Sequence, residues 1–412
     1  MNTLTDIITL PELLAPSGDL TRLKAAVDFG ADAVYLAGEE FGMRTAASNF
    51  GEEDLKTGIE YAHSHGVKVH VTCNTIPHNS EIPRLPAFLE TLNSLGADAI
   101  IASDIGTMGL VKKYAPDCEL HISVQSGICN YETARAFHDF GAKRVVLARE
   151  LSLDEIAEIR AKTPQDLELE AFAHGAMCVS FSARCLLSSY MTGRDANRGD
   201  CAQSCRWSYS LMEEKRPGQF FDITETDKGT YILNANDMCM APYLDKMIKA
   251  GISSLKLEGR AKSHYYTAVV TNAYRGALDS LCENPLNWEC PQWVLEELNK
   301  ISHRTYSTGF YMGAPENSQT YENAGYVRDY SVAAIVDGYE DGCIVATLKN
   351  KFLKGQVLDC LEPKAPPFTV IAETLLNGKG EEIDSAPHPM MTIKIPFDRP
   401  VKAGALLRMK AE

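Results

Sequence analysis

Five cysteines in the middle of the chain are the residues whose type and spacing point most directly to chemistry. They are Cys178, Cys185, Cys201, Cys205 and Cys239. Structural zinc sites usually draw ligands from C-x-x-C pairs, and no such pair is present here. Iron–sulfur clusters accept thiolates from more widely spaced loops. The spacing therefore favours an iron–sulfur cluster, while a zinc site and buried thiols without a ligand both remain open.

Charged side chains near the ends of expected strands form a second group. Arginine pairs with carboxylates through two parallel hydrogen bonds, so several arginines at one opening predict an anionic ligand such as a dicarboxylate. The residues that we predict to be catalytic are His174, Arg149, Glu258 and Arg260, and those that we predict to hold a bound co-substrate are Arg44, Arg184, Arg206 and Lys262. Most common hydrolase and nucleotide motifs are absent, including H-E-x-x-H, G-x-S-x-G and the phosphate-binding loop G-x-x-x-x-G-K-[ST].

A repeated strand–helix pattern must position these residues. Short apolar, β-branched runs alternate with amphipathic helical stretches, which favours a (β/α)8 TIM-like barrel over an open doubly wound sheet. The expected barrel strands are 12–15, 33–37, 68–72, 99–102, 121–124, 144–148, 167–173 and 253–257. The residues that follow parallel strands meet at one end of a barrel, where barrel enzymes carry out their chemistry. Some polar residues there, such as Asp19 and Asp104, have the alternative role of helix caps.

The same patterning divides the chain into parts. We expect the barrel domain over residues 1–312, with the cysteine-bearing insertion around 174–252 after the seventh strand. That insertion should contain a β-hairpin made of 207–212 and 231–234. A linker over 313–324 should lead to a small antiparallel β-barrel over 325–412, where short strands and turns replace the helices.

Composition limits the setting of the protein. The chain has 412 residues and a formal net charge of −15, which disfavours coating of nucleic acid by the whole surface but leaves room for a local basic face. One such stretch is 174–206, where four arginines face two aspartates. No apolar run is long enough for a membrane span, and residues 1–10 do not resemble a leader peptide. Together with unpaired cysteine usage, this predicts a cytoplasmic protein.

Several dispersed motifs carry a resemblance to a known family. The run 170–188 (EAFAHGAMCVSFSARCLLS) resembles the signature of the collagenase-like peptidase family of unknown catalytic type, with Ala183 where the family has glycine. Further motifs similar to that family are 12–19 (ELLAPSGD), 197–206 (NRGDCAQSCR), 256–263 (KLEGRAKS) and 303–311 (HRTYSTGFY).

The resemblance implies an activity that the family name does not describe. Its well-understood members hydroxylate tRNA, ribosomal RNA or a quinone precursor without oxygen, and they carry a [4Fe-4S] cluster. The implied ligands are Cys178, Cys185, Cys201 and Cys239, with Cys205 as the alternative fourth ligand. The chain looks most like the branch that makes 5-hydroxyuridine at the tRNA wobble position with prephenate as hydroxyl source. We therefore expect tRNA and prephenate as partners, and a homodimer or a heterodimer with a paralogue as a further option. The alternatives are a collagenase-like peptidase and a non-catalytic iron–sulfur subunit of a hydroxylase complex.

Overall fold

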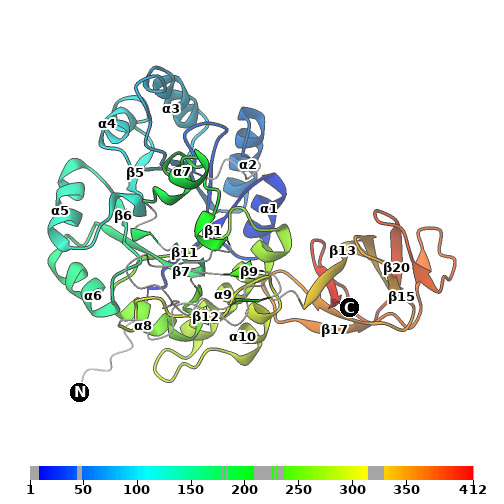
Figure 1. Cartoon of the computed structure of the whole chain (residues 1–412). Helices are drawn as coiled ribbons and strands as arrows, with labels where there is room; N and C mark the ends of the chain where they lie inside the picture. The colour runs from blue at the N-terminus through cyan, green and yellow to red at the C-terminus, as the bar shows by residue number, and fades with distance from the viewer. Residues whose placement is uncertain are drawn as a thin grey trace.

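A computed structural model of the chain describes residues 9–43, 49–178, 180–181, 184–207, 225–226, 229–230, 236–313 and 329–411. It shows a closed barrel of parallel strands with helices around it and a separate antiparallel β-domain at the C-terminal end (Figure 1). Among the helices in these ranges, none has both the length and the apolar character needed to cross a bilayer.

Eight parallel strands form the barrel, as the alternating pattern predicts. They are β1 (Glu12–Pro16), β2 (Ala33–Leu36), β3 (Lys68–Cys73), β4 (Ala99–Ala102), β5 (Glu119–Ile122), β6 (Arg144–Val146), β7 (Glu168–Ala176) and β11 (Ser254–Leu257). Each strand pairs in parallel with its neighbour, and β11 pairs with both β7 and β1. These last two pairings close the sheet, so the open doubly wound alternative is excluded.

Helices cover the outside of the barrel. They are α1 (Leu20–Asp28), α2 (Glu52–Ser64), α3 (Leu85–Ser94), α4 (Ile105–Tyr114), α5 (Tyr131–Phe140), α6 (Leu153–Lys162), α8 (Leu244–Lys249), α9 (His264–Glu283) and α10 (Gln292–Asn299). Gly30, Gly96 and Gly141 follow three of them with φ of 106°, 79° and 105°, a conformation that glycine adopts without strain. Asp19 and Asp104 accept backbone hydrogen bonds at the starts of α1 and α4, so both are helix caps.

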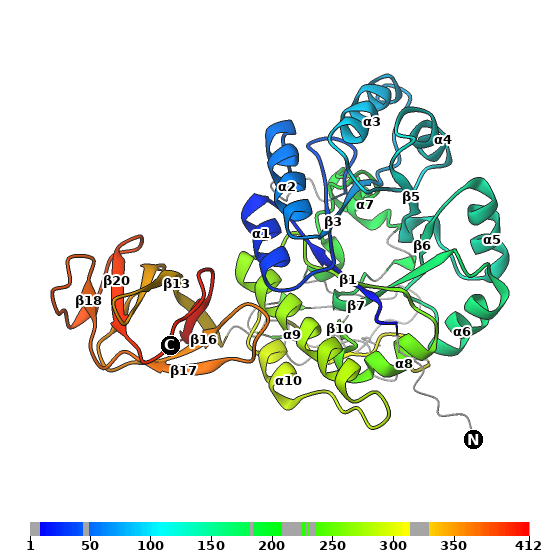
Figure 2. The ribbon, with the colours of Figure 1, turned by 180° about the vertical axis from the view of Figure 1, so that it is seen from behind.

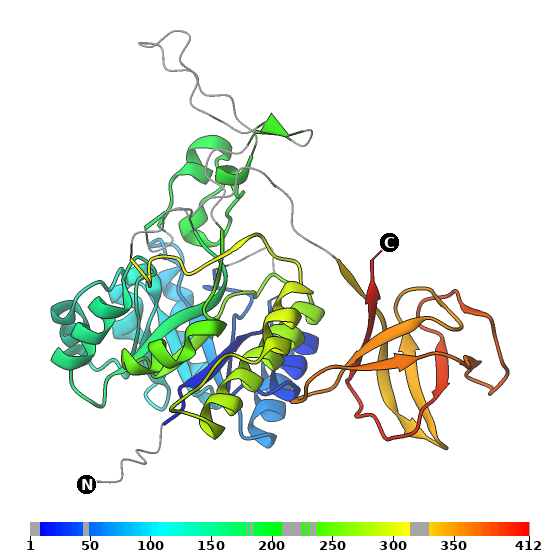
Figure 3. The same cartoon turned by 90° about the horizontal axis from the view of Figure 1, so that it is seen from below.

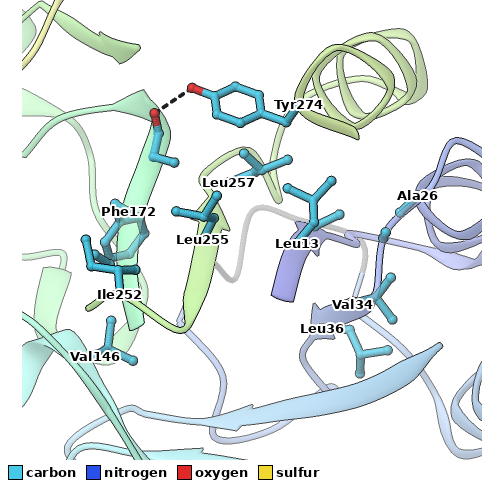
Figure 4. Close-up of a cluster of buried hydrophobic side chains, with 14 of the residues drawn as sticks. Leu13, Ala26, Val34, Leu36, Val146, Phe172, Ile252, Leu255, Leu257 and Tyr274 are labelled. Atoms are coloured by element: carbon cyan, nitrogen blue, oxygen red, sulfur yellow. Dashed lines mark hydrogen bonds between the residues drawn. The ribbon is translucent and has the colours of Figure 1, made fainter. Parts of the chain in front are cut away.

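The main hydrophobic core lies between the strands and this ring of helices. Figure 4 shows Leu13 of β1 and Leu255 and Leu257 of β11 in this layer, with Tyr274 of α9 packed above them. The Tyr274 hydroxyl donates a hydrogen bond of 2.7 Å to the carbonyl of Ala173. The core therefore fixes the strand β7, whose end leads into the cysteine-bearing insertion.

The insertion after β7 stands on the end of the barrel where the strands finish (Figure 3). Its described elements are α7 (Leu187–Thr192), the short 3-10 helices η4 (Ala196–Arg198) and η5 (Ser204–Arg206), and the two-residue strands β8 (Glu225–Thr226) and β9 (Gly229–Thr230). It ends in β10 (Asp237–Cys239), which pairs antiparallel to β7 and parallel to β12 (Tyr306–Ser307). The expected hairpin of 207–212 and 231–234 lies almost wholly outside the described residues, as does most of the expected linker 313–324.

The described part of the C-terminal domain consists of a seven-stranded antiparallel sheet and a separate two-stranded sheet, with a core of its own. Its strands are β13 (Tyr330–Glu340), β14 (Cys343–Leu348), β15 (Phe352–Leu353), β16 (Val357–Leu361), β17 (Phe368–Ile371), β18 (Leu376–Asn377), β19 (Ser385–Ala386), β20 (Thr392–Pro396) and β21 (Leu406–Lys410). Figures 1 and 2 both show it beside α9 and α10. Arg408 of β21 reaches the barrel there, with hydrogen bonds of 2.6 and 2.9 Å to the carboxylate of Glu297 on α10.

Candidate functional site

A cavity of about 80 Å³ opens where the barrel strands end. Its lining comes from seven of the eight barrel strands or the loops directly after them, and it includes both charged and aromatic side chains. The described lining residues are Tyr35, Met43, Thr72, Asn74, Ile101, Ser123, Val124, Gln125, Val146, Arg149, Phe172, Lys256, Glu258 and Arg260. Parallel strands bring residues from distant parts of the sequence to one mouth in this way, and such mouths hold the active sites of barrel enzymes.

Cations outnumber carboxylates in the described lining. Arg149, Lys256 and Arg260 face the single carboxylate of Glu258. The Nη2 atom of Arg149 lies 3.9 Å from Oε2 of Glu258, and its Nη1 donates a hydrogen bond of 2.9 Å to the carbonyl of Ala176. Arg260 donates from Nη1 to Oγ1 of Thr72 at 3.0 Å. The mouth is therefore suited to an anionic ligand, which these guanidinium groups can bind through paired hydrogen bonds.

Two aromatic rings hold these cations in place. The central carbon of the Arg149 guanidinium lies 3.7 Å from the ring centroid of Phe172. The Nζ atom of Lys256 lies 4.3 Å from the ring centroid of Tyr35. Cations over aromatic faces are attracted by the electron-rich ring. The Tyr35 hydroxyl also donates to the carbonyl of Leu257 at 3.0 Å and lies 3.4 Å from Oε2 of Glu258.

Below the cavity, a network of ion pairs lies inside the barrel. Lys256 donates from Nζ to Oε1 of Glu170 at 2.7 Å, and Arg144 lies 3.1 Å from the other oxygen of Glu170. Arg144 also pairs with Glu12 and Glu168 at 2.5 and 2.6 Å. Burial pushes the pKa of Glu170 upward, but the charges of Lys256 and Arg144 outweigh it, so the pKa lies below its usual value. The carboxylate is therefore ionised and fixes the position of Lys256.

His174, which we predict to be catalytic, lies outside the cavity's described lining. The strand β7 continues to Ala176, and its pairing with β11 shifts in register next to Leu257. The His174 ring packs among Tyr266, Tyr274 and Tyr306, at centroid distances of 5.4 to 6.1 Å. Burial lowers its pKa to about 3. The structure thus gives this histidine a neutral, packed environment.

Of the predicted co-substrate residues, the structure describes the side chains of Lys262 and Arg184, and neither is in the cavity's described lining. Lys262 donates from Nζ to the carbonyl of Ser302 at 3.1 Å and lies outside the described lining. Arg184 is exposed on the insertion. Arg44 and the side chain of Arg206 fall outside the described part of the structure. Of the charged residues singled out from the sequence, the cavity gathers Arg149, Glu258 and Arg260.

The cysteines are thiols, but they do not form an assembled metal site. All twelve lie in the described ranges, and none forms a disulfide. Their chemistry suits an iron–sulfur cluster, which thiolates hold. In the described part of the chain, however, no three His, Cys, Asp or Glu side chains converge as metal ligands. The cluster and its ligands therefore stay a prediction.

The individual cysteines occupy two structural settings. Cys185 is tied to η4, because its N–H donates to Oδ1 of Asn197 at 3.2 Å and its carbonyl accepts from Nδ2 of the same residue at 3.1 Å. Cys201 and Cys205 lie on the same insertion. Cys239 lies on β10 opposite His174, beside the barrel strand β7, where burial raises its pKa to about 11.

Lys256, Tyr35 and Phe172 are lining residues that our sequence prediction did not select. All three lie within barrel strands, on the face that points inward, whereas our selection considered charged residues after the strands. The sequence does contain a feature that marks Lys256: it is a lysine within a short apolar run. Ser254 and Glu258, two residues before and after it, are polar residues expected on the same face of that strand. A lysine at such a position is rarely buried without a partner.

Comparisons with known proteins assign the barrel and the C-terminal domain to the same family. The model of "Peptidase family U32" matches residues 18–321, and that of the "Peptidase family U32 C-terminal domain" matches residues 328–408. A relative from Bacillus subtilis named "tRNA hydroxylation protein P1" is 37% identical over 97% of this chain and 94% of its own length.

Two further relatives carry other names. The "23S rRNA 5-hydroxycytidine C2501 synthase" of Escherichia coli is 39% identical, over 90% of this chain and 52% of its own length. A "Collagenase" of Porphyromonas gingivalis is 34% identical, over 73% of each chain. The relatives therefore include two proteins named for RNA hydroxylation and one named for proteolysis.

Proposed function

Since the chain belongs to peptidase family U32 in both its barrel and its C-terminal domain, we propose that it hydroxylates RNA and that its product is 5-hydroxyuridine at the wobble position of tRNA. The relative named for tRNA hydroxylation supports this proposal, because the alignment spans nearly the whole of both chains. The relative named as an rRNA hydroxycytidine synthase points to the same class of reaction on a pyrimidine. A tRNA substrate and twelve reduced cysteines are both compatible with the cytoplasm.

The cationic cavity at the barrel mouth is the observation that carries this proposal. We propose that it binds prephenate, a dicarboxylate with a hydroxyl-bearing ring. In this assignment, Arg149 and Arg260 bind carboxylate oxygens. Tyr35 and Phe172 supply aromatic lining around the ligand, and Lys256 contributes positive charge.

The proposed reaction balances without molecular oxygen. The C5–H bond of uridine and the C–OH bond of the donor are exchanged for a C–OH bond in uridine and a C–H bond in the donor. The two-electron oxidation of the base is thus matched by a two-electron reduction of the donor. The protein must hold the two reactants together and exclude water, and a partly enclosed cavity lined by aromatic rings provides such an environment.

We also propose a [4Fe-4S] cluster held by Cys178, Cys185 and Cys201, with Cys239 as the fourth ligand and Cys205 as its alternative. A bound cluster would supply electron transfer or a Lewis-acidic iron. Among the described residues, the thiols do not converge, so the proposed reaction has no step that involves the cluster.

The experiment that tests the proposed function measures modified nucleosides in tRNA. A strain that lacks the gene should lose 5-hydroxyuridine by mass spectrometry, and the wild-type gene should restore it. Arg149→Gln and Arg260→Gln should fail to restore it, because each removes a cavity cation. Arg135→Gln should restore it fully, since Arg135 is half exposed on α5, far from the cavity. Normal 5-hydroxyuridine in the deletion strain would overturn the assignment.

Two alternatives have specific tests. The collagenase relative makes proteolysis the second candidate; the described cavity lining, however, contains no histidine or cysteine to serve as base or nucleophile. Gelatin cleavage by metal-free protein, abolished by Arg149→Gln, would favour the peptidase. If the protein is instead a non-catalytic iron–sulfur subunit, both Arg149→Gln and Arg260→Gln should fully restore 5-hydroxyuridine in the deletion strain.

A further inference from the structure

The insertion over the barrel mouth exposes an unusual number of large apolar side chains. Five of the thirteen such residues exposed in the described part of the chain fall within 181–207. They are Phe181, Leu186, Tyr190, Met191 and Trp207, and Tyr190 is the most exposed of them at 82%. Exposed apolar side chains gathered on one short segment indicate an interaction surface.

The segment that carries them is folded rather than an extended loop. Ser188 is buried on α7, and its Oγ accepts a hydrogen bond of 2.9 Å from the N–H of Ala202. Thr192 closes the same face by donating to the carbonyl of Ser188 at 2.8 Å. Tyr190 lies two residues after the buried Ser188, which places it on the opposite side of the helix, and both it and the following Met191 are exposed. Their exposure is therefore a property of the folded insertion.

The insertion is fastened to the mouth of the barrel. Arg198 pairs with Glu81, in the loop after β3, at 2.7 Å. The N–H of Ile76, from the same loop, donates to the carbonyl of Asn197 at 3.4 Å. Figure 3 shows α7 above the end of the barrel where the strands finish, and Figure 1 shows it over the ring of strands. The insertion that carries the exposed side chains thus stands at the end of the barrel where the cavity opens.

The charge of this surface selects its partner. Residues 181–207 contain Arg184, Arg194, Arg198 and Arg206 against Asp195 and Asp200, a net charge of +2, whereas the whole chain carries −15. Protein–protein interfaces are depleted of charge at their apolar centres. Aromatic side chains interleaved with arginines instead match single-stranded nucleic acid, whose bases stack on rings while its phosphates bind cations.

We propose that the surface formed by Phe181, Arg184, Leu186, Tyr190 and Met191 is a stacking platform for unpaired RNA bases next to the one that enters the cavity. This inference rests on the proposed function, because it names how that function's RNA substrate is held. A base must leave its stack to reach an enclosed site. In this proposal, the ring of Tyr190 gives the neighbouring base a replacement stacking partner. Arg184, six residues before Tyr190 in the sequence, binds the adjacent phosphate.

The test is the binding of the full-length protein to two fluorescent RNAs, measured by anisotropy. One is a hairpin with a seven-nucleotide loop that contains uridine, and the other is a fully paired duplex of the same length. Tyr190→Ala should weaken loop binding roughly five- to a hundredfold, the range expected for one lost base–aromatic stack. Tyr190→Phe should retain the affinity, because the ring remains. Neither change should affect the much weaker duplex binding.

Two further variants sharpen the result. Leu286→Ala removes a side chain that is 86% exposed in the loop after α9, and it should leave loop binding unchanged. Arg184→Gln should lower the slope of log Kd against log salt by about 0.7, as expected for one lost contact to a single-stranded phosphate. Unchanged thermal stability of Tyr190→Ala would show that the variant is folded.

Three other outcomes would decide between the platform and its alternatives. Equal loop affinity of Tyr190→Ala and wild type would overturn the platform. So would a wild-type dimer that Tyr190→Ala dissociates without a change in RNA affinity, because the surface would then be a self-association face. Tyr190-dependent loop binding without any 5-hydroxyuridine formation would retain the platform and overturn the proposed function instead.

Discussion

The guanidinium of Arg149 lies over the ring of Phe172, with its central carbon 3.7 Å from the ring centroid. The ring limits the directions in which the guanidinium can turn, while the Ala176 carbonyl holds one of its nitrogens. Its Nη2 atom lies 3.9 Å from Oε2 of Glu258, so these contacts together fix the orientation of the guanidinium at the cavity. A pre-oriented planar fork binds a carboxylate with less loss of side-chain freedom than a mobile cation does.

We expect Arg149→Lys to raise the KM for the anionic co-substrate by roughly tenfold, or about 1.4 kcal/mol. The lysine keeps the charge but loses the planar fork and the stack on Phe172. Initial rates against co-substrate concentration measure the effect, and Arg135→Lys on α5 is the matched control. A KM equal to that of the wild type would show that Arg149 does not bind the co-substrate.

Arg144 forms ion pairs with three carboxylates near the start of the barrel strands, those of Glu12, Glu168 and Glu170. Arg144→Met should destabilise the protein by about 3–5 kcal/mol, because Glu12 loses this cation and the fully buried Glu170 keeps only its ion pair with Lys256 among the described residues. Urea unfolding followed by far-UV circular dichroism measures this loss. Arg135→Met, which removes an exposed arginine, should change stability by less than about 0.5 kcal/mol. Similar midpoints for the two variants would contradict this role.

His70 and His121 are buried side by side within the barrel, with ring centroids 4.8 Å apart. Burial, reinforced by nearby cations such as Arg144, lowers the pKa of both rings well below its usual value. The folded state therefore keeps them neutral, while the unfolded chain binds protons below about pH 6.5. Stability should fall as the pH drops below that value, by up to about 1.4 kcal/mol per pH unit for each ring.

His70→Phe should make this fall in stability shallower, because one proton-binding group is removed from the unfolded chain. The measurement is urea unfolding from pH 7.5 to 5, with each protein compared with its own value at pH 7.5. Parallel curves for the variant and the wild type would show that His70 does not contribute.

Regular features of the site were predictable from the sequence, and pairings between distant residues were not. Asn74, Gln125, Arg149, Glu258 and Arg260 all follow predicted strands, and all line the cavity, because parallel strands end at the same face. The rule fails at His174, since β7 runs on to pair with β10 and no sequence pattern marks that extension.

Lys256 shows the other limit of sequence reasoning. Its burial depends on Glu170, on a strand 86 residues earlier in the chain. A single sequence does not reveal that these two residues face each other, because the contact arises only when the barrel closes between β7 and β11.

Arg408 and Glu297 join the two domains through a buried ion pair, extended by Asp359 at 2.8 Å from Arg408. Arg408→Met should destabilise the protein by about 3–5 kcal/mol, because the buried Glu297 loses both hydrogen bonds from Arg408 and keeps Lys300, at 2.8 Å, as a partner on one oxygen. The double variant Arg408→Met, Glu297→Met should recover most of that loss, since paired apolar residues often replace a buried ion pair at little cost. Thermal unfolding and limited proteolysis of the variants measure both effects. A double variant no more stable than the single one would show that the pair itself stabilises the domain contact.

The cysteine variants decide whether the proposed cluster exists and which thiol is its fourth ligand. After anaerobic purification, the wild type should show broad brown absorption, with iron and sulfide near four per chain. Single serine substitutions of Cys178, Cys185, Cys201 and Cys239 should each lose most of the iron, whereas Cys205→Ser should keep it.

Cys343→Ser, in the β-domain, is the matched control, because β14 belongs to a separate core. Loss of iron in Cys205→Ser but not in Cys239→Ser would make Cys205 the fourth ligand, consistent with its place on the same insertion as Cys201. Colourless wild-type protein, free of iron after anaerobic purification, would remove the cluster from the proposal.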